Sequence, residues 1–236
     1  FHMLNNAIYK GGLFLTAGAV EQESGKDKLE DLGGLSKVMP LTFFAALIFA
    51  LSISGIPPFN GFTSKWMIYQ GIIDFGAGTS LASKLWMVWL GLAVLGSALT
   101  LASFVKFIGG IFLGRRQEAF SKLREVSLVM WIPMVILSLA CIGLGIFATS
   151  WVVPHLFMPV AGTFEFTGTW SSSTVSVLVL VSIALGLLIY YLGSIKNMRT
   201  SDSFVGGENL QEEFSYSTPE FYKSFQEFGW LDAMYR

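Results

Sequence analysis

Residues 52–66 read SISGIPPFNGFTSKW, a polar and helix-breaking stretch inside an apolar segment that spans about 40–74. That segment is too long to cross a membrane once as a straight helix, because each residue adds about 1.5 Å of length. Gly55, Pro57 and Pro58 cannot sustain a regular helix, since proline lacks the backbone N–H and clashes with the preceding turn. We therefore predict two half-helices joined by an irregular linker.

A break of this kind leaves backbone groups that lipid cannot satisfy, so it must be buried in protein or line a wet cavity. Carbonyl oxygens are expected to be free near Gly55, and N–H groups from Gly61 onward. Lys65 lies just past the break, beside the positive end of the second half-helix and away from bulk water, which favours a lysine that releases and rebinds a proton. Broken helices mark ion sites in transporters. The alternative is a simple kink, with Lys65 in a salt bridge that serves assembly.

The composition indicates an integral membrane protein. Of the 236 residues, 53% are hydrophobic and 13% are charged, whereas soluble domains carry about 25% charged residues. The net charge of -1 argues against a nucleic-acid partner. One cysteine, Cys141, and two histidines, His2 and His155, are too few for a haem, iron–sulfur or zinc site. We expect no cofactor or metal, and no bond to be made or broken by this chain itself, even if it serves an oxidoreductase.

The apolar segments predict an all-α membrane fold with about five crossing units, one of them discontinuous. The bundle is expected to occupy residues 1–195, and an aromatic-rich tail to occupy residues 196–236. A straight helix needs about 20 apolar residues to cross the hydrocarbon, which the last three units meet easily. The expected units are about 2–20, 40–74, 84–113, 127–150 and 174–195.

Basic residues in the connections predict the orientation. The 114–126 connection, GRRQEAFSKLREV, is rich in Arg and Lys, whereas the 151–173 connection has neither. Because Lys and Arg gather on the cytoplasmic side, we predict a multi-pass protein of the inner (cytoplasmic) membrane with its tail, 196–236, in the cytoplasm. The tail's many aromatic residues favour docking on a neighbouring subunit. A partly disordered tail is the alternative.

Further ionisable side chains lie within the apolar segments. His2, Asn6 and Lys10 are spaced four apart, which places them along one face of a helix. Lys10 is predicted to lie near the middle of the bilayer, where a charge is costly and usually belongs to a relay or a pair. The alternative is that Lys10 simply reaches water. Lys106 suits either a proton entry route or a lysine that extends to the membrane surface.

Three strings resemble a known family: FHMLNNAIYKGGLFLTAGAV at 1–20, LGGLSKVMPLTFFAALIFALSISGIPPFNGFTSKWMIYQ at 32–70, and SFVKFIGGIFLGRR at 103–116. They are similar to the antiporter-like, ion-translocating subunits of respiratory complex I, Mrp-type sodium/proton antiporters, membrane-bound hydrogenases and formate hydrogenlyases. The third string looks most like the hydrogenase branch. The resemblance covers residues 1 to about 150 well and the remainder weakly.

The resemblance implies two inverted helix bundles, each with one broken helix, of which this chain would hold the last part of the second. Lys65 matches the family's titratable residue on that broken helix, which exchanges protons with the outer side. His2 and Lys10 match polar residues of a central hydrated axis. Asn6 departs from the pattern, because histidine is common there, so water would have to bridge that link. The chain starts at Phe1 and is expected to be the C-terminal part of a longer protein.

These observations predict a proton-translocating subunit of a redox-driven membrane complex. Its expected partners are other membrane subunits, including further antiporter-like ones, the lipid bilayer and H⁺. One alternative is a subunit of an Mrp-type sodium/proton antiporter, in which Ser54, Thr63 and Ser64 could supply oxygen ligands to Na⁺. The other is a structural membrane anchor that moves no ions, with its lysines paired and static.

Overall fold

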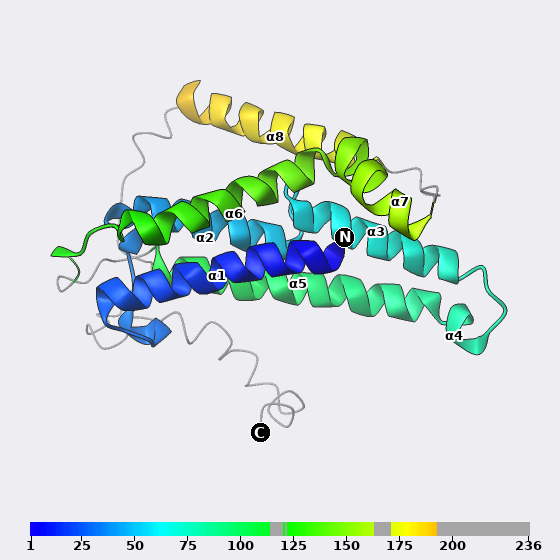
Figure 1. Cartoon of the computed structure of the whole chain (residues 1–236), viewed down its shortest axis with the longest axis horizontal. Coiled ribbons are helices and arrows are strands. Elements are labelled where there is room, and N and C mark those ends of the chain that lie inside the picture. The colour runs from blue at the N-terminus through cyan, green and yellow to red at the C-terminus, as the bar shows by residue number, and fades with distance from the viewer. Residues whose placement is uncertain (114–119, 121, 163–170, 193–236) are drawn as a thin grey trace, which may run out of the picture.

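The computed structural model describes residues 1–113, 120, 122–162 and 171–192, and across them the regular structure is helical (Figure 1). The expected all-α class is confirmed. The α-helices are α1 His2–Ser24, α2 Pro40–Ser54, α3 Asn60–Phe75, α4 Leu81–Lys84, α5 Trp86–Ile111, α6 Leu128–Ile146, α7 Met158–Ala161 and α8 Ser172–Leu192. Two 3₁₀ turns, η1 Leu29–Asp31 and η2 Leu35–Lys37, connect α1 to α2, and a π-type segment, η4 Ala148–Phe157, follows α6.

The discontinuous helix is confirmed, because α2 ends at Ser54 and α3 begins at Asn60. Gly55 ends α2 in the left-handed region with φ of 78°, a conformation that glycine adopts without steric cost. Its N–H donates to the Ser52 carbonyl at 3.0 Å, and the Ile56 N–H donates to the Leu51 carbonyl at 3.0 Å. These two bonds satisfy two of the last carbonyl oxygens of α2 in the manner of a glycine-capped helix end.

Two glycines let the backbone pack tightly around the break. A Cβ added to Gly61 would lie 1.7 Å from the Ser52 carbonyl oxygen, so the start of α3 lies directly against the end of α2. A Cβ added to Gly145 of α6 would lie 2.1 Å from the Pro58 carbonyl oxygen. Helix α6 therefore backs the linker, which meets the requirement that irregular backbone in a membrane be covered by protein.

The core lies where α1 packs against α2 and α6. Tyr9, Phe49, Met134 and Cys141 are almost fully buried there. Gly12 sits under the Phe49 ring, since an added Cβ would lie 2.2 Å from its Cζ atom. This close approach of α1 to α2 sets the polar first half of α1 beside the break.

Glu125, in the connection before α6, holds the start of α2. Its Oε2 atom accepts bonds from the Leu41 N–H at 2.7 Å and the Thr42 N–H at 3.3 Å, and its Oε1 atom accepts from Thr42 Oγ1 at 2.5 Å. The first N–H groups of a helix have no partner within it, and they favour a carboxylate. Pro40 at the first turn has no N–H to satisfy.

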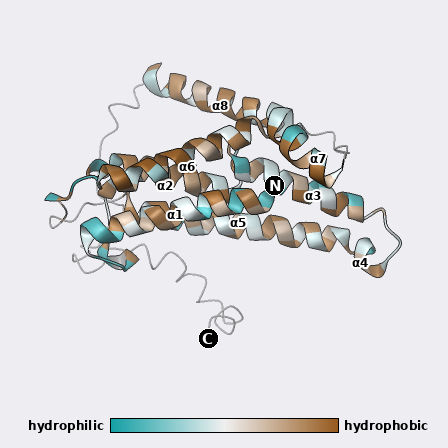
Figure 2. Cartoon of the chain, viewed as in Figure 1, coloured by the Kyte–Doolittle hydropathy of each residue, from teal (hydrophilic) through white to brown (hydrophobic). Residues whose placement is uncertain are grey.

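Three helices of the described part are long and apolar enough to cross a membrane: α5, α6 and residues Ser173–Leu192 of α8. Figure 2 shows hydrophobic colour along these helices and along α2, with hydrophilic patches on α1 and in the connections. Helix α2 is apolar but shorter than a full crossing. The number of five crossings and their orientation therefore stay predictions.

The connection at 151–173 is more regular than expected. Its first part, together with residues 148–150, forms η4 and α7, even though it contains Pro154 and Pro159. Proline is tolerated in the first turn of a helix, where Pro159 lies in α7, and Pro154 falls within the wider π-type turns of η4. The expected domain boundary after residue 195, the tail at 196–236 and residues 114–119 lie outside the described residues.

Candidate functional site: a polar groove beside the broken helix

Lys65 lies in the second turn of α3, and its side chain runs back toward the break. A Cβ added to Gly55 would lie 2.9 Å from Lys65 Cδ and 3.6 Å from Nζ. Gly55 therefore has two roles, since it ends α2 and also leaves room for the lysine side chain. Any larger residue at position 55 would press on Lys65.

His2, at the start of α1, is joined to the first turns of α3. Its Nδ1 atom lies 2.9 Å from Ser64 Oγ, and the Ser64 hydroxyl donates to the Gly61 carbonyl oxygen at 3.2 Å. With the Ser64 hydrogen on that carbonyl, His2 Nδ1 is the donor to Ser64 Oγ. The residue before Lys65 thus anchors His2 to the same helix end.

A pair of asparagines makes a second link between α1 and α3. Asn5 Nδ2 donates to the Asn60 carbonyl oxygen at 3.2 Å, and Asn60 Nδ2 donates to Asn5 Oδ1 at 3.1 Å. Both side chains are fully buried. In a membrane such bonds replace water for groups that lipid cannot satisfy. Asn60 is also the first residue of α3, so the pair fixes where the second half-helix begins.

The polar side chains of α1 and Lys65 meet in one groove of about 500 Å³. Four of the five residues proposed for the ion pathway are therefore together, as expected from their four-residue spacing on α1 and from the break. Helix α5 supplies the opposite wall. The lining residues are His2, Asn6, Tyr9, Lys10, Ile53, Lys65, Leu99, Thr100, Ser103 and Phe104.

The groove is suited to hold water. The hydroxyls of Thr100 and Ser103 donate to carbonyls of their own helix, at 2.7 Å and 3.0 Å, and so keep oxygen lone pairs free. Nearby, the buried hydroxyl of Ser54 has no hydrogen-bond partner among the described residues. Buried polar groups of this kind are usually satisfied by ordered water.

Lys106 does not line this groove. It lies half-buried on α5, beyond Phe104 and nearer the inner end predicted for that helix. The role of Lys106 as an entry residue stays a prediction.

Sequence reasoning did not single out Asn5, Asn60, Thr100 or Ser103, and it named Ser64 only as a possible Na⁺ ligand. Asn5 and Asn60 did carry a signal, since amides within apolar segments usually bond to a neighbouring helix. Thr100 and Ser103 had none, because isolated hydroxyls in a membrane helix commonly bond to their own backbone. Only the packing of α5 beside α3 shows that they face the lysine groove.

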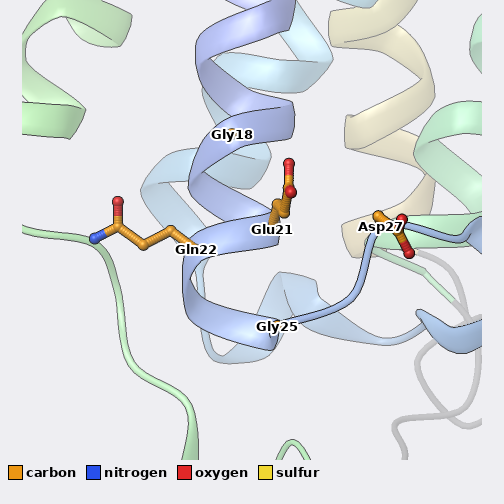
Figure 3. A pocket seen from close by; sticks show the side chains of 5 residues that line it. All are labelled: Gly18, Glu21, Gln22, Gly25 and Asp27. Carbon is orange, nitrogen blue, oxygen red and sulfur yellow. The ribbon is translucent and has the colours of Figure 1, made fainter.

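A second pocket, of about 570 Å³, lies at the opposite end of α1, about three helical turns beyond Lys10. Figure 3 shows the Glu21 and Asp27 side chains on either side of the turn at Gly25. This pocket is separate from the lysine groove. Within the described residues, no group of three or more His, Cys, Asp or Glu side chains could hold a metal ion.

The structural class is thus a helical membrane bundle with a broken helix and a polar groove at the break. Residues 1–91 match a family described as NADH:quinone oxidoreductase/Mrp antiporter, transmembrane. This segment matches the antiporter-like family, and the resemblance indicated by the motifs is confirmed. Since the family is a transmembrane one, the chain is placed in a membrane.

Curated relatives come from both branches expected from the motifs. The chain is 35% identical to hydrogenase-4 component B of Escherichia coli over 210 residues, covering 81% of this chain and 31% of that protein. It is 32% identical to formate hydrogenlyase subunit 3 of the same organism, covering 78% and 31%. Against Na(+)/H(+) antiporter subunit A1 of Staphylococcus saprophyticus the identity is 38%, covering 62% and 19%. The chain therefore spans a third or less of the length of these relatives.

Solved structures show the same fold. A chain of the archaeal membrane-bound sulfane sulfur reductase, a respiratory membrane complex, superposes with a TM-score of 0.74 at 24% identity, covering 97% of this chain and 38% of that one. A chain of the Mrp complex from Dietzia sp. superposes with a TM-score of 0.54 at 27% identity, covering 62% and 34%.

Proposed function

We propose that this chain moves protons across a membrane as part of an antiporter-like subunit in a multi-subunit, redox-driven complex. The observation that carries the proposal is the groove at the break, which brings His2, Asn6 and Lys10 of α1 together with Lys65 of α3. Relatives named as hydrogenase and formate hydrogenlyase components support the redox-driven setting.

In the proposed mechanism, protons move between His2, Lys10 and Lys65 through water in the groove. The Ser64 hydroxyl holds His2 at the start of α3, and Gly55 keeps space for the Lys65 side chain. Asn6 has no proton to give at neutral pH, so water must bridge between His2 and Lys10. A change of charge at one end of this axis, caused by electron transfer in partner subunits, would shift the proton affinity of the next group. Lys65 would then release its proton toward the other side.

A second candidate is exchange of H⁺ for Na⁺ in an Mrp-type complex. The relative named as an antiporter subunit A1 supports it, and so do the buried hydroxyls of Ser54, Thr63 and Ser64 near the break. Sodium prefers oxygen ligands, as other hard cations do. Co-purification with iron–sulfur subunits favours the redox-driven complex. Sodium-dependent proton flux in a complex without such subunits favours the antiporter.

The test is Lys65→Met in the complete complex, reconstituted into lipid vesicles. We expect proton translocation to be lost while subunit composition stays unchanged, because methionine keeps much of the side-chain volume but carries no proton. Lys84→Met, at an exposed position on α4 outside the groove, is the matched control and should translocate normally. Normal translocation by the Lys65→Met complex would contradict the proposal and favour a structural anchor.

A further inference from the structure

The polar character of the lysine groove continues along the contact between α3 and α5. Tyr69 Oη, on α3, lies 2.5 Å from Ser97 Oγ on α5, and both side chains are partly buried. Either oxygen can be the donor in this bond. This short distance links hydroxyl groups of two neighbouring helices.

Tyr69 and Ser97 each lie one helical turn from a residue that lines the groove. Tyr69 follows Lys65 by four residues and so lies one turn further along the same face of α3. Ser97 precedes Thr100, which lines the groove, by three residues, which is one turn of α5. Helices α3 and α5 run side by side in opposite directions and are joined through α4 (Figure 1). Both steps therefore lead from the groove toward the α4 end of the bundle.

The chemistry of these side chains suits proton transfer. The Thr100 hydroxyl donates to its own helix at 2.7 Å and keeps a free acceptor for a water molecule in the groove. The Tyr69 and Ser97 hydroxyls can each accept a proton on oxygen and pass on their own. Hydroxyl chains of this type let a proton travel without any side chain crossing the membrane.

We propose that the Tyr69–Ser97 pair carries protons between the Lys65 groove and the α4 end of the bundle, with Thr100 holding the connecting water. This inference rests on the proposed function. In the transfer, one Lys65 N–H bond breaks and its proton joins a groove water, which passes a different proton to the hydroxyl pair. The pair releases one of its own protons to water at the α4 end. Lysine is left neutral, and no electron changes hands.

The experiment uses Tyr69→Phe and Ser97→Ala in the complete complex, reconstituted into vesicles with a pH-sensitive dye. We expect each variant to slow proton flux by about tenfold, because water can replace only part of a lost hydroxyl relay. Ser97→Thr keeps the hydroxyl and should restore most of the flux. The solvent isotope effect in D₂O should rise in both slowed variants, since proton transfer at this link becomes rate-limiting.

The matched controls are Ser182→Ala and Tyr190→Phe on α8, which remove the same groups away from the groove. Both should translocate normally. Unchanged proton flux in Tyr69→Phe and Ser97→Ala would overturn the proposal. A complex with lower thermal stability but normal flux per assembled complex would overturn it too, because the hydroxyl pair would then only hold the two helices together. Lys65→Met, measured in parallel, separates the two ideas. If Lys65→Met abolishes proton flux while Tyr69→Phe and Ser97→Ala do not, the route through the hydroxyl pair is wrong and the proposed function stands.

Discussion

At the scale of single residues, Gly55 and Lys65 depend on each other. Gly55 adopts a φ of 78°, and a Cβ added there would lie 2.9 Å from Lys65 Cδ. The backbone conformation favours glycine at this position, and a Cβ there would push the Lys65 side chain aside. A substitution should therefore affect stability and transport together.

Gly55→Ala is expected to destabilise the protein by about 1–2 kcal/mol, because an L-residue other than glycine is strained in the left-handed region. It should also reduce proton flux by more than the loss of folded protein explains, since Lys65 is displaced. Apparent melting temperature and flux in vesicles are the measurements. Gly11→Ala is the control, because a Cβ at Gly11 meets nothing within 4 Å and alanine favours the helix. Equal behaviour of the two variants would contradict the dependence on Gly55.

At the scale of elements, the two half-helices form one unit through close backbone contact. Gly61 of α3 lies against the Ser52 carbonyl of α2, and Gly145 of α6 lies against the linker. The Asn5–Asn60 pair then joins α1 to the first residue of α3. The break is thus packed closely between α1 and α6.

Gly61→Ala should separate α3 from α2, because the added Cβ would lie 1.7 Å from a backbone oxygen that has little freedom to move. We expect a large loss of assembled complex, seen by size-exclusion chromatography and subunit stoichiometry. Gly71→Ala on the same helix should assemble normally, since a Cβ there meets nothing within 4 Å. Normal assembly of Gly61→Ala would show that the half-helices can move apart at low cost.

At the scale of the whole molecule, the connection before α6 supports the broken helix from its far end. Glu125 accepts three hydrogen bonds from the first turn of α2, whose last turn forms the break. The packing of α1 on α2 and α6 then keeps the α1 residues of the groove next to the break.

Glu125→Ala is expected to cost about 1–2 kcal/mol, the usual range for a lost helix N-terminal cap. The readout is the apparent melting temperature of the purified complex. Glu21→Ala, at an exposed position near the end of α1, should leave it nearly unchanged. A melting temperature for Glu125→Ala equal to that of the parent protein would mean that water replaces the carboxylate without cost.

The sequence by itself determined the all-α membrane class and the break at Gly55, Pro57 and Pro58, because proline and glycine limit backbone geometry locally. It also showed Lys65 just past that break, where an ionisable group in an apolar segment is costly. It also placed His2, Asn6 and Lys10 on one face, since helical spacing is a local property. Only the tertiary structure decided that Thr100 and Ser103 of α5 line the groove, that Asn5 meets Asn60, and that Lys106 is not among the lining residues. These depend on how helices distant in sequence pack, which no local pattern specifies.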